Sequence, residues 1–324
     1  MGVVRWWLDQ TEFQRGISMK VTAVHEPPSY YDLAGSIERC VEIISRAARG
    51  GSKLVVFPEA WLPGYVNFVW ALTPTHDETG DYPEVYKRLW DNAVDLNTDV
   101  LVPILDAARE NGVVVVLGIQ EKSGGTLYNT CLIIDADGTV LNVHRKLMPT
   151  NAERTVWGFG DGSTLRVVDS AVGRVGVLLC WENYMPMARM ALYAQNVEIF
   201  CAPTAYEPDL WHITMQHIGM EGSCVVIGVC SCVRIDDVPE DLPGRAEMAE
   251  WGEWVSSGNA SIIAPGGRVL AGPAQMTQGL IEAEVDLAAV AERRRLFDVA
   301  GHYARPDVFT LNVDRTHKAP VRFS

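Results

Sequence analysis

Three chemically reactive side chains in this 324-residue chain each come at the end of an apolar run that is typical of a β-strand. They are Glu59 after residues 53–57, Lys146 after residues 139–144, and Cys180 after residues 172–179. Loops at strand ends often carry function, because the sheet beneath them holds their side chains in place. The sequence therefore predicts that these three positions are candidates for catalysis.

Each of the three residue types suits a definite chemical role. Partial burial beside a core raises the pKa of a carboxyl group, so Glu59 could act as a base. Lys146 could hold a fixed positive charge against an oxyanion or a thiolate. A nearby cation would lower the pKa of Cys180 from about 8.5 toward neutrality and supply a nucleophilic thiolate. Taken singly, each segment also fits a plain structural role: an exposed glutamate, a solvated basic edge or a buried cysteine.

The elements that would position these residues alternate along the chain. Strands are predicted at 20–24, 53–57 and 113–119, with helices at 33–44 and 100–110 between them. A hairpin is predicted over 126–134 and 139–144, around the turn 135–138. Further strands are predicted at 172–179, 198–202, 224–231, 260–264, 268–271 and 280–285, with helices after Pro186 and at 212–221. Two packed sheets with helices outside them would accommodate this many strands.

Composition limits the possible functions. The chain has 27 Lys and Arg against 41 Asp and Glu, a net charge of −14, which disfavours binding to nucleic acid. No apolar run is long enough to span a bilayer, so no membrane partner is predicted, and no signal peptide is recognised. The seven cysteines are scattered and mostly lie in apolar runs, which predicts free thiols and a cytoplasmic location.

We expect a single α/β domain over residues 19–315. Residues 1–18 are interpreted as an N-terminal extension and residues 316–324 as a C-terminal tail. Residues 236–253 hold seven acids and two prolines and interrupt the strand pattern, so we interpret them as an acidic, solvated surface insertion.

Three motifs around the candidate residues resemble one family when they are taken together. Phe57-Pro58-Glu59-Ala60, Arg145-Lys146-Leu147 and Cys180-Trp181-Glu182-Asn183 are similar, in order and spacing, to the Glu-Lys-Cys signatures of the nitrilase superfamily of carbon–nitrogen hydrolases. The resemblance runs from about residue 20 to residue 311 and includes 124–129, 157–163 and 301–306. The tryptophan after the cysteine is similar to the true nitrilase branch, whereas amidases and carbamoylases usually have another residue there.

The resemblance implies a fold and a set of roles. The fold is a four-layer α-β-β-α sandwich, and no metal or organic cofactor is expected. Glu59 would be the general base, Lys146 would stabilise the tetrahedral intermediate, and Cys180 would be the nucleophile. Glu121 matches the second glutamate of the family, which orients the lysine or assists proton transfer. The resemblance also suggests substrate-binding residues, which are Tyr65, Trp181 and Tyr206.

The implied reaction converts a small organic nitrile to a carboxylic acid and ammonia through a thioimidate and a thioester on the cysteine. An amidase, a carbamoylase or a cyanide-degrading enzyme are the alternatives within the superfamily, and a catalytically silent scaffold that forms assemblies is a further one. The sequence does not rank aliphatic, aryl and arylaceto nitriles. The resemblance also implies a homo-oligomer that pairs through the helix after the cysteine and the helix at 212–221. A dimer or a larger assembly is expected, with a helical filament as one form of the latter.

Overall fold

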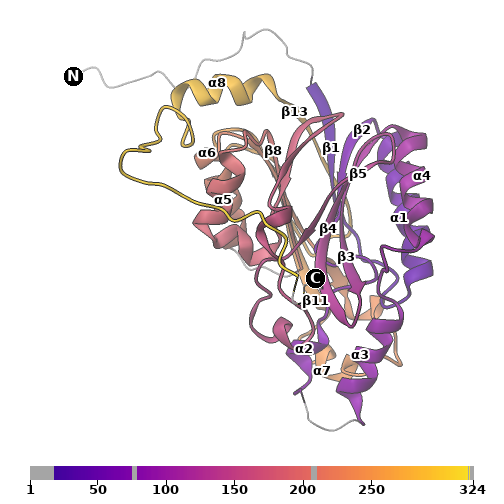
Figure 1. Ribbon diagram of the computed structural model, residues 1–324. Helices are drawn as coiled ribbons and strands as arrows, with labels where there is room; N and C mark the ends of the chain where they lie inside the picture. Colours follow the sequence, from indigo (N-terminus) through magenta and orange to yellow (C-terminus); the bar gives the residue numbers. More distant parts are fainter. Residues whose placement is uncertain (1–17, 75–78, 206–209, 320, 322–324) are drawn as a thin grey trace.

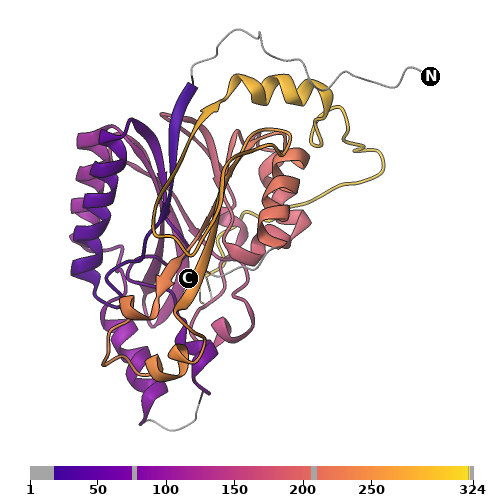
Figure 2. The ribbon, with the colours of Figure 1, turned by 180° about the vertical axis from the view of Figure 1, so that it is seen from behind.

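Two β-sheets lie face to face, and each is covered on its outer face by a pair of helices (Figures 1 and 2). This computed structural model describes residues 18–74, 79–205, 210–319 and 321. The covering helices are α1 (Leu33–Arg49) and α4 (Val102–Asn111) on one sheet, and α5 (Pro186–Tyr193) and α6 (Leu210–Glu221) on the other. This arrangement confirms the predicted four-layer α-β-β-α sandwich.

The first sheet brings two of the candidate residues to one edge. Within the described residues its order is β13-β1-β2-β3-β4-β5. Its strands are β1 (Ser18–His25), β2 (Ser52–Val56), β3 (Val114–Ser123), β4 (Thr126–Ile134), β5 (Val140–Arg145) and β13 (Gly279–Asp286). Strand β2 is parallel to β3, and β5 runs the same way because two antiparallel pairings separate it from β3. The carboxyl ends of β2 and β5, which lead to Glu59 and Lys146, therefore lie at the same edge.

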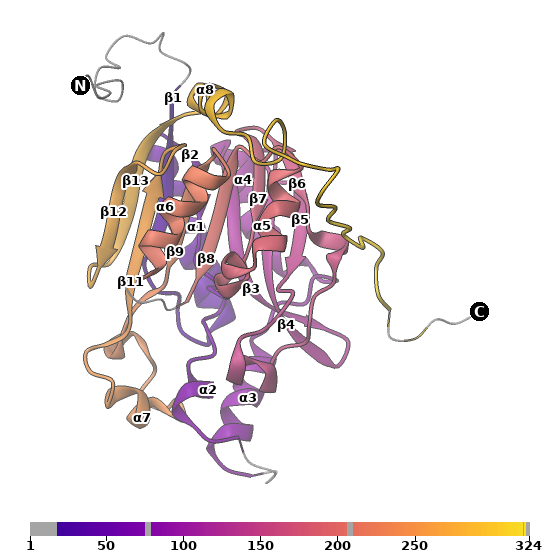
Figure 3. The same ribbon diagram turned by 90° about the vertical axis from the view of Figure 1, so that its left-hand side faces the viewer.

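The second sheet carries the cysteine. Its described order is β10-β11-β9-β8-β7-β6, with β12 paired to β11. Its strands are β6 (Val167–Ser170), β7 (Gly173–Val177), β8 (Ile199–Thr204), β9 (Val225–Cys230), β10 (Cys232–Arg234), β11 (Trp254–Ile263) and β12 (Val269–Gln275). Strands β7, β8 and β9 are parallel, and α5 and α6 lie over them in Figure 3.

The apolar strands are buried on both faces. Successive side chains along a strand point alternately into the space between the two sheets and into the layer between a sheet and its helices. Leu54 and Val56 of β2 pack between the two sheets, whereas Val55 and Phe57 pack against the layer of α1 and α4. This alternation is the ordinary period of a strand. It explains why the predicted strands appear as continuous apolar runs rather than as alternating ones.

Several elements were not predicted from the sequence. They are α2 (Phe68–Ala71), α3 (Asp81–Asp91), α7 (Arg245–Ala249), α8 (Ala288–Leu296), β6 and β10. Only Val85 and Leu89 are buried in α3, and only Val290 in α8. So few buried positions give a weak helical pattern. None of the helices in the described part of the chain has the length and apolar character needed to cross a bilayer.

The sequence suggested that the acidic segment 236–253 is a solvated surface insertion, but part of this segment is buried. Several of its acids are exposed, but Val238, Leu242 and Met248 are buried in the cluster that also contains Phe68. The helix α7 in this segment contacts α2, at the end of the sandwich where α3 also lies (Figure 3). Of the predicted N-terminal extension, only Ser18 is described, and it begins β1.

Candidate active site

Glu59 lies just beyond β2 and is fully buried. Its Oε1 accepts hydrogen bonds from Asn129 Nδ2 at 2.7 Å and from Lys146 Nζ at 2.6 Å. Its Oε2 is buried and has no hydrogen-bond partner among the described residues. A buried polar atom without a partner costs free energy, and such atoms often mark functional sites. One oxygen of this carboxylate is therefore fixed, and the other is left available to accept a proton.

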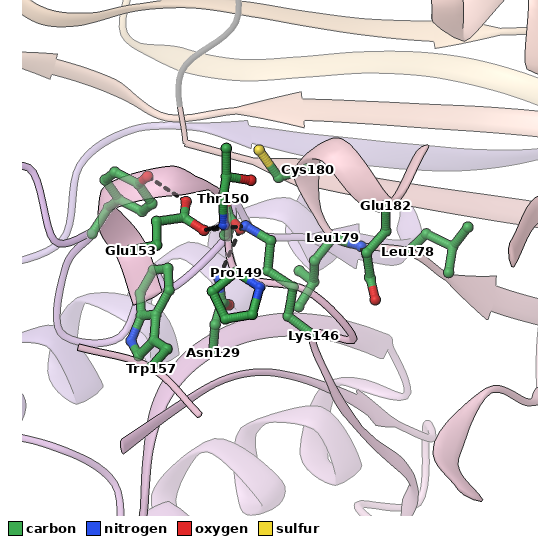
Figure 4. A network of polar contacts seen from close by, with 12 residues as sticks. Asn129, Lys146, Pro149, Thr150, Glu153, Trp157, Leu178, Leu179, Cys180 and Glu182 are labelled. Atoms are coloured by element: carbon green, nitrogen blue, oxygen red, sulfur yellow. Dashed lines mark hydrogen bonds and ion pairs between the residues drawn. The ribbon is translucent and has the colours of Figure 1, made fainter. Parts of the chain in front are cut away.

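Lys146 directly follows β5, and its ammonium group joins two carboxylates (Figure 4). Nζ donates to Glu59 Oε1 at 2.6 Å and to Glu153 Oε2 at 2.8 Å, and all three side chains are buried. The ring of Trp157 lies 5.7 Å from Nζ, measured to the ring centroid. These contacts hold the positive charge in one place, as stabilisation of a developing negative charge requires.

Glu153 is a site residue that the sequence analysis missed. It lies in a short 3-10 helix, Asn151–Thr155, whose first turn is fixed by a capping box between Thr150 and Glu153. Glu153 Oε2 accepts from Thr150 N at 2.5 Å, and Oε1 accepts from Tyr65 Oη at 2.5 Å. The Thr-x-x-Glu spacing of a capping box was visible in the sequence and could have marked this position.

Among the described residues Glu121 makes no hydrogen bond or ion pair with Lys146, so the expectation that it orients the lysine is not met, and its alternative role in proton transfer stays a prediction. Its Oε1 accepts from Arg145 Nη2 at 2.5 Å. Its Oε2 accepts from Arg145 Nε at 2.8 Å and from Thr130 Oγ1 at 2.6 Å. The neighbouring arginine thus occupies both oxygens of Glu121, and the place expected for it beside Lys146 is taken by Glu153.

Cys180 follows β7 and begins a 3-10 helix, Cys180–Tyr184. Its φ angle is 49°, a left-handed conformation that is strained for a residue with a side chain and is often found at functional sites. Asn183 Nδ2 donates to Cys180 O at 2.8 Å and to Leu178 O at 3.0 Å, which holds this turn. The residue is 5 % exposed, and Figure 4 shows its sulfur beside the cluster of Lys146 and Glu153.

The cluster shifts the pKa of both Glu59 and Cys180. Burial and the charge of Glu153 raise the pKa of Glu59 to about 7, although Lys146 opposes the shift. Burial and Glu59 also raise the pKa of the Cys180 thiol well above its ordinary value, and Lys146 only partly offsets them. This differs from the expectation that a neighbouring cation would lower the pKa of Cys180, because burial of the thiol and the charge of Glu59 outweigh the effect of the lysine. Burial disfavours the charge on Lys146, but these carboxylates hold the pKa of the lysine above its usual range.

The order of these pKa values determines what the site can do. At neutral pH the proton lies on Cys180 and Lys146 is charged, while the raised pKa of Glu59, about 7, places the titration of this carboxyl near neutral pH. A pKa near the working pH is favourable for a general base. The arrangement can therefore move the thiol proton to a carboxylate as the sulfur attacks an electrophile, with an ammonium group in place to stabilise the negative charge that forms.

The three expected substrate-binding residues have different positions. Tyr65 is buried, and its hydroxyl supports Glu153 as described above. The side chain of Trp181 is 53 % exposed, with its ring edge-on to Tyr184 at 6.0 Å between centroids. Tyr206 lies outside the described residues. Within the described part of the chain, no group of three or more His, Cys, Asp and Glu side chains could hold a metal ion.

Comparisons with known proteins point to one family of hydrolases. The family model described as carbon–nitrogen hydrolase matches residues 20–295. Nitrilase 2 of Arabidopsis thaliana is 41% identical over 311 residues, which cover 94% of this chain and 91% of the relative. Bifunctional nitrilase/nitrile hydratase NIT4A of Nicotiana tabacum is 38% identical over 311 residues, with coverage of 95% and 89%.

Solved structures share the fold at much lower identity. The crystal structure of a carbon–nitrogen hydrolase from Helicobacter pylori G27 matches with a TM-score of 0.68 and 19% identity, and covers 90% of this chain and 96% of that one. The family match, the related sequences and the shared fold confirm the resemblance first found in the motifs around Glu59, Lys146 and Cys180. The chain belongs to the carbon–nitrogen hydrolase family and, within it, to the nitrilase branch.

Proposed function

We propose that this protein hydrolyses a small organic nitrile to the carboxylic acid and ammonia. The observation that carries the proposal is the buried, unpartnered Oε2 of Glu59, in a cluster that also holds a fixed ammonium group and a thiol. These are a base, an electrostatic stabiliser and a nucleophile. Relatives named nitrilases, 38–41% identical over most of their length, support the nitrile as the substrate class.

In the first half of the proposed reaction, Cys180 adds to the nitrile carbon. Glu59 takes the thiol proton as the carbon–sulfur bond forms and one carbon–nitrogen π bond breaks. Lys146 stabilises the negative charge that develops on nitrogen, and the family resemblance adds the backbone N–H of Trp181 as a second donor. Protonation of the nitrogen gives a neutral thioimidate on the cysteine.

In the second half, two water molecules are consumed. Glu59 removes a proton from the first water as it adds to the thioimidate, and ammonia leaves the tetrahedral centre to give a thioester. The second water releases the carboxylic acid and restores the Cys180 thiol. One nitrile and two waters thus yield one acid and one ammonia, with no redox change.

The product distribution tests this proposal. An arylaceto nitrile, an aliphatic nitrile and the two matching amides are incubated with the purified protein, and acid, amide and ammonia are quantified by chromatography. We expect acid and ammonia in equal amounts from at least one nitrile, with amide as a minor product. Turnover of the amides with both nitriles inert would instead favour an amidase, and no ammonia from any compound would favour a silent scaffold.

Amide is measured separately because the tetrahedral intermediate formed by the first water can break down in two ways. If the thiolate leaves instead of ammonia, the product is the amide, and a difference of about 1.4 kcal/mol between the two barriers changes the ratio tenfold. One relative is named a bifunctional nitrilase/nitrile hydratase. Lys146 and Glu59 favour acid here if they keep the departing nitrogen protonated.

We also propose that the protein forms homo-oligomers. Several apolar side chains on α5 and α6 are exposed: Met187, Leu210, Ile213 and Met220. Helices α5 and α6 lie together on the outer face of the second sheet (Figure 3), and apolar surfaces of this kind mark interaction sites. Sedimentation should give at least a dimer, and Ile213→Glu should weaken it. A monomer of the unaltered protein at all salt concentrations would contradict this.

The state of the cysteines supports a cytoplasmic location for this enzyme. All seven are free and buried, as is usual in a reducing compartment. Cell fractionation of the native source with an antibody against the protein would test this, and recovery from an extracellular fraction would contradict it.

A further inference from the structure

Glu182 makes contacts that the proposed reaction does not use. Its Oε1 accepts a hydrogen bond from Leu147 N at 2.7 Å, and its Oε2 accepts one from Leu179 N at 2.6 Å. Leu147 directly follows Lys146, and Leu179 directly precedes Cys180. One buried carboxylate therefore holds the backbone next to the lysine and the backbone next to the cysteine at the same time. Figure 4 shows Glu182 beside Leu179 and Cys180.

These two backbone segments belong to different sheets. Leu147 continues from β5 of the first sheet, whereas Leu179 continues from β7 of the second. Glu59 and Lys146 are thus carried by one sheet and Cys180 by the other. The separation between the nucleophile and its charged partners depends on how the two sheets meet at this point, and Glu182 bridges them there.

The side chain of His144 contacts the bridging carboxylate of Glu182. Its Nε2 lies 3.0 Å from Glu182 Oε2 and 3.2 Å from Oε1, and both side chains are fully buried. An ionised carboxylate only accepts hydrogen bonds, so Nε2 must be the donor. Burial disfavours the charge on Glu182, but His144 and the two backbone N–H groups hold the pKa of the carboxyl below its usual value. Both oxygens of Glu182 are thus occupied by donors.

We propose that Glu182, held by His144, is a positioning residue that fixes Cys180 relative to Lys146 and Glu59. Glu182 touches no reacting atom in the proposed mechanism; it acts through the backbone on either side of it. A misplacement of about 1 Å between reacting groups can cost about 100-fold in rate, so a bridge at this place controls turnover without contacting substrate. The kinetic part of this inference rests on the proposed function, and the labelling experiment below does not.

Glu182→Gln breaks the bridge at nearly constant volume. A glutamine amide has one acceptor oxygen, and its nitrogen is itself a donor, so it would face the N–H of Leu147 or Leu179 without bonding it. We expect kcat on a nitrile to fall about 100-fold with KM nearly unchanged. A matched control is Glu198→Gln. Among the described residues the side chain of Glu198 accepts one hydrogen bond, from Arg174 N to Oε2, and Glu198 lies just before the first residue of β8, at the end of the strand away from Thr204.

Alkylation of the thiol gives a readout that needs no nitrile. Iodoacetamide is added to each variant, and the labelled peptide is identified by mass spectrometry, with Cys180→Ala to confirm the position. We expect labelling of Cys180 to be slower by about tenfold in Glu182→Gln and unchanged in Glu198→Gln. If the unaltered protein turned over no nitrile or amide, the proposed function would fail, and the ratio of labelling rates would still decide the inference.

A second pair of variants covers the case in which Glu182→Gln does not fold. His144→Gln keeps an N–H donor for Glu182, whereas His144→Leu removes it. We expect both kcat and the labelling rate to fall in His144→Leu and to be largely restored in His144→Gln. Equal values for these two variants, wild-type kcat and labelling in Glu182→Gln, or equal losses in Glu198→Gln would each overturn the proposal.

Discussion

From the pKa of Glu59 we predict how the activity depends on pH. Burial and Glu153 raise this pKa to about 7, and only the ionised carboxylate can accept the thiol proton. As the pH falls through 7, Glu59 becomes protonated and kcat/KM must fall. At pH 5, two units below that pKa, about 1% of Glu59 is ionised, so kcat/KM should be about 100-fold lower than its plateau.

The variant Glu153→Gln tests whether the charge of Glu153 contributes to the raised pKa of Glu59. Glu59 and Glu153 share Lys146 Nζ, so they lie within a few ångströms of each other. Two unit charges about 4 Å apart interact by about 4 kcal/mol at an effective dielectric constant of 20. One pKa unit corresponds to about 1.4 kcal/mol, so removing the charge of Glu153 should lower the pKa of Glu59 by at least about one unit.

The assay is kcat/KM for one nitrile between pH 4.5 and 9, with circular dichroism at each pH to confirm that the protein remains folded. The acid limb should lie near pH 7 in the unaltered protein and at lower pH in Glu153→Gln, whatever the height of the plateau. Lys146→Met should move the limb the other way, because the lysine favours ionised Glu59. A limb at the same pH in all three proteins would refute the reasoning.

Three further predictions concern the same cluster. Cys180→Ala should abolish turnover and labelling by iodoacetamide while the melting temperature changes little; appreciable remaining activity would exclude the thiol mechanism. Glu153→Gln should lower kcat about 100-fold, and Glu121→Gln much less, because Glu153 bonds to Lys146 and Glu121 does not; steady-state kinetics showing equal losses would contradict the assignment. The double variant Glu59→Gln/Lys146→Met should be hardly slower than either single one, since both act in the same step; additive losses would show that they act separately.

The residues that the sequence identified best are those whose signal is local. Glu59, Lys146 and Cys180 each follow an apolar strand within a recognisable motif, and the layered sheets place strand ends together. The buried strands were predicted for the same reason, because continuous apolar runs are seen directly in the sequence. Helix α8 was not, since only Val290 of its nine residues is buried.

What the sequence could not provide are properties that depend on neighbours in space. Glu121 was assigned beside Lys146 from the family resemblance alone, but the direction of its carboxylate is set by Arg145 on β5. The pKa of Cys180 was expected to fall beside a cation. It rises instead, because the outcome depends on the depth of burial and on the number of carboxylates that share Lys146.

The most direct test of the account is to look for the covalent intermediate. The protein is mixed with a saturating organic nitrile, quenched with acid during steady turnover, digested and analysed by mass spectrometry. We predict that the peptide containing Cys180 gains the mass of the acyl group of the product acid, and that this adduct disappears when the nitrile is exhausted. Turnover of the nitrile with Cys180 unmodified, or with the adduct on another residue, would contradict the central claim.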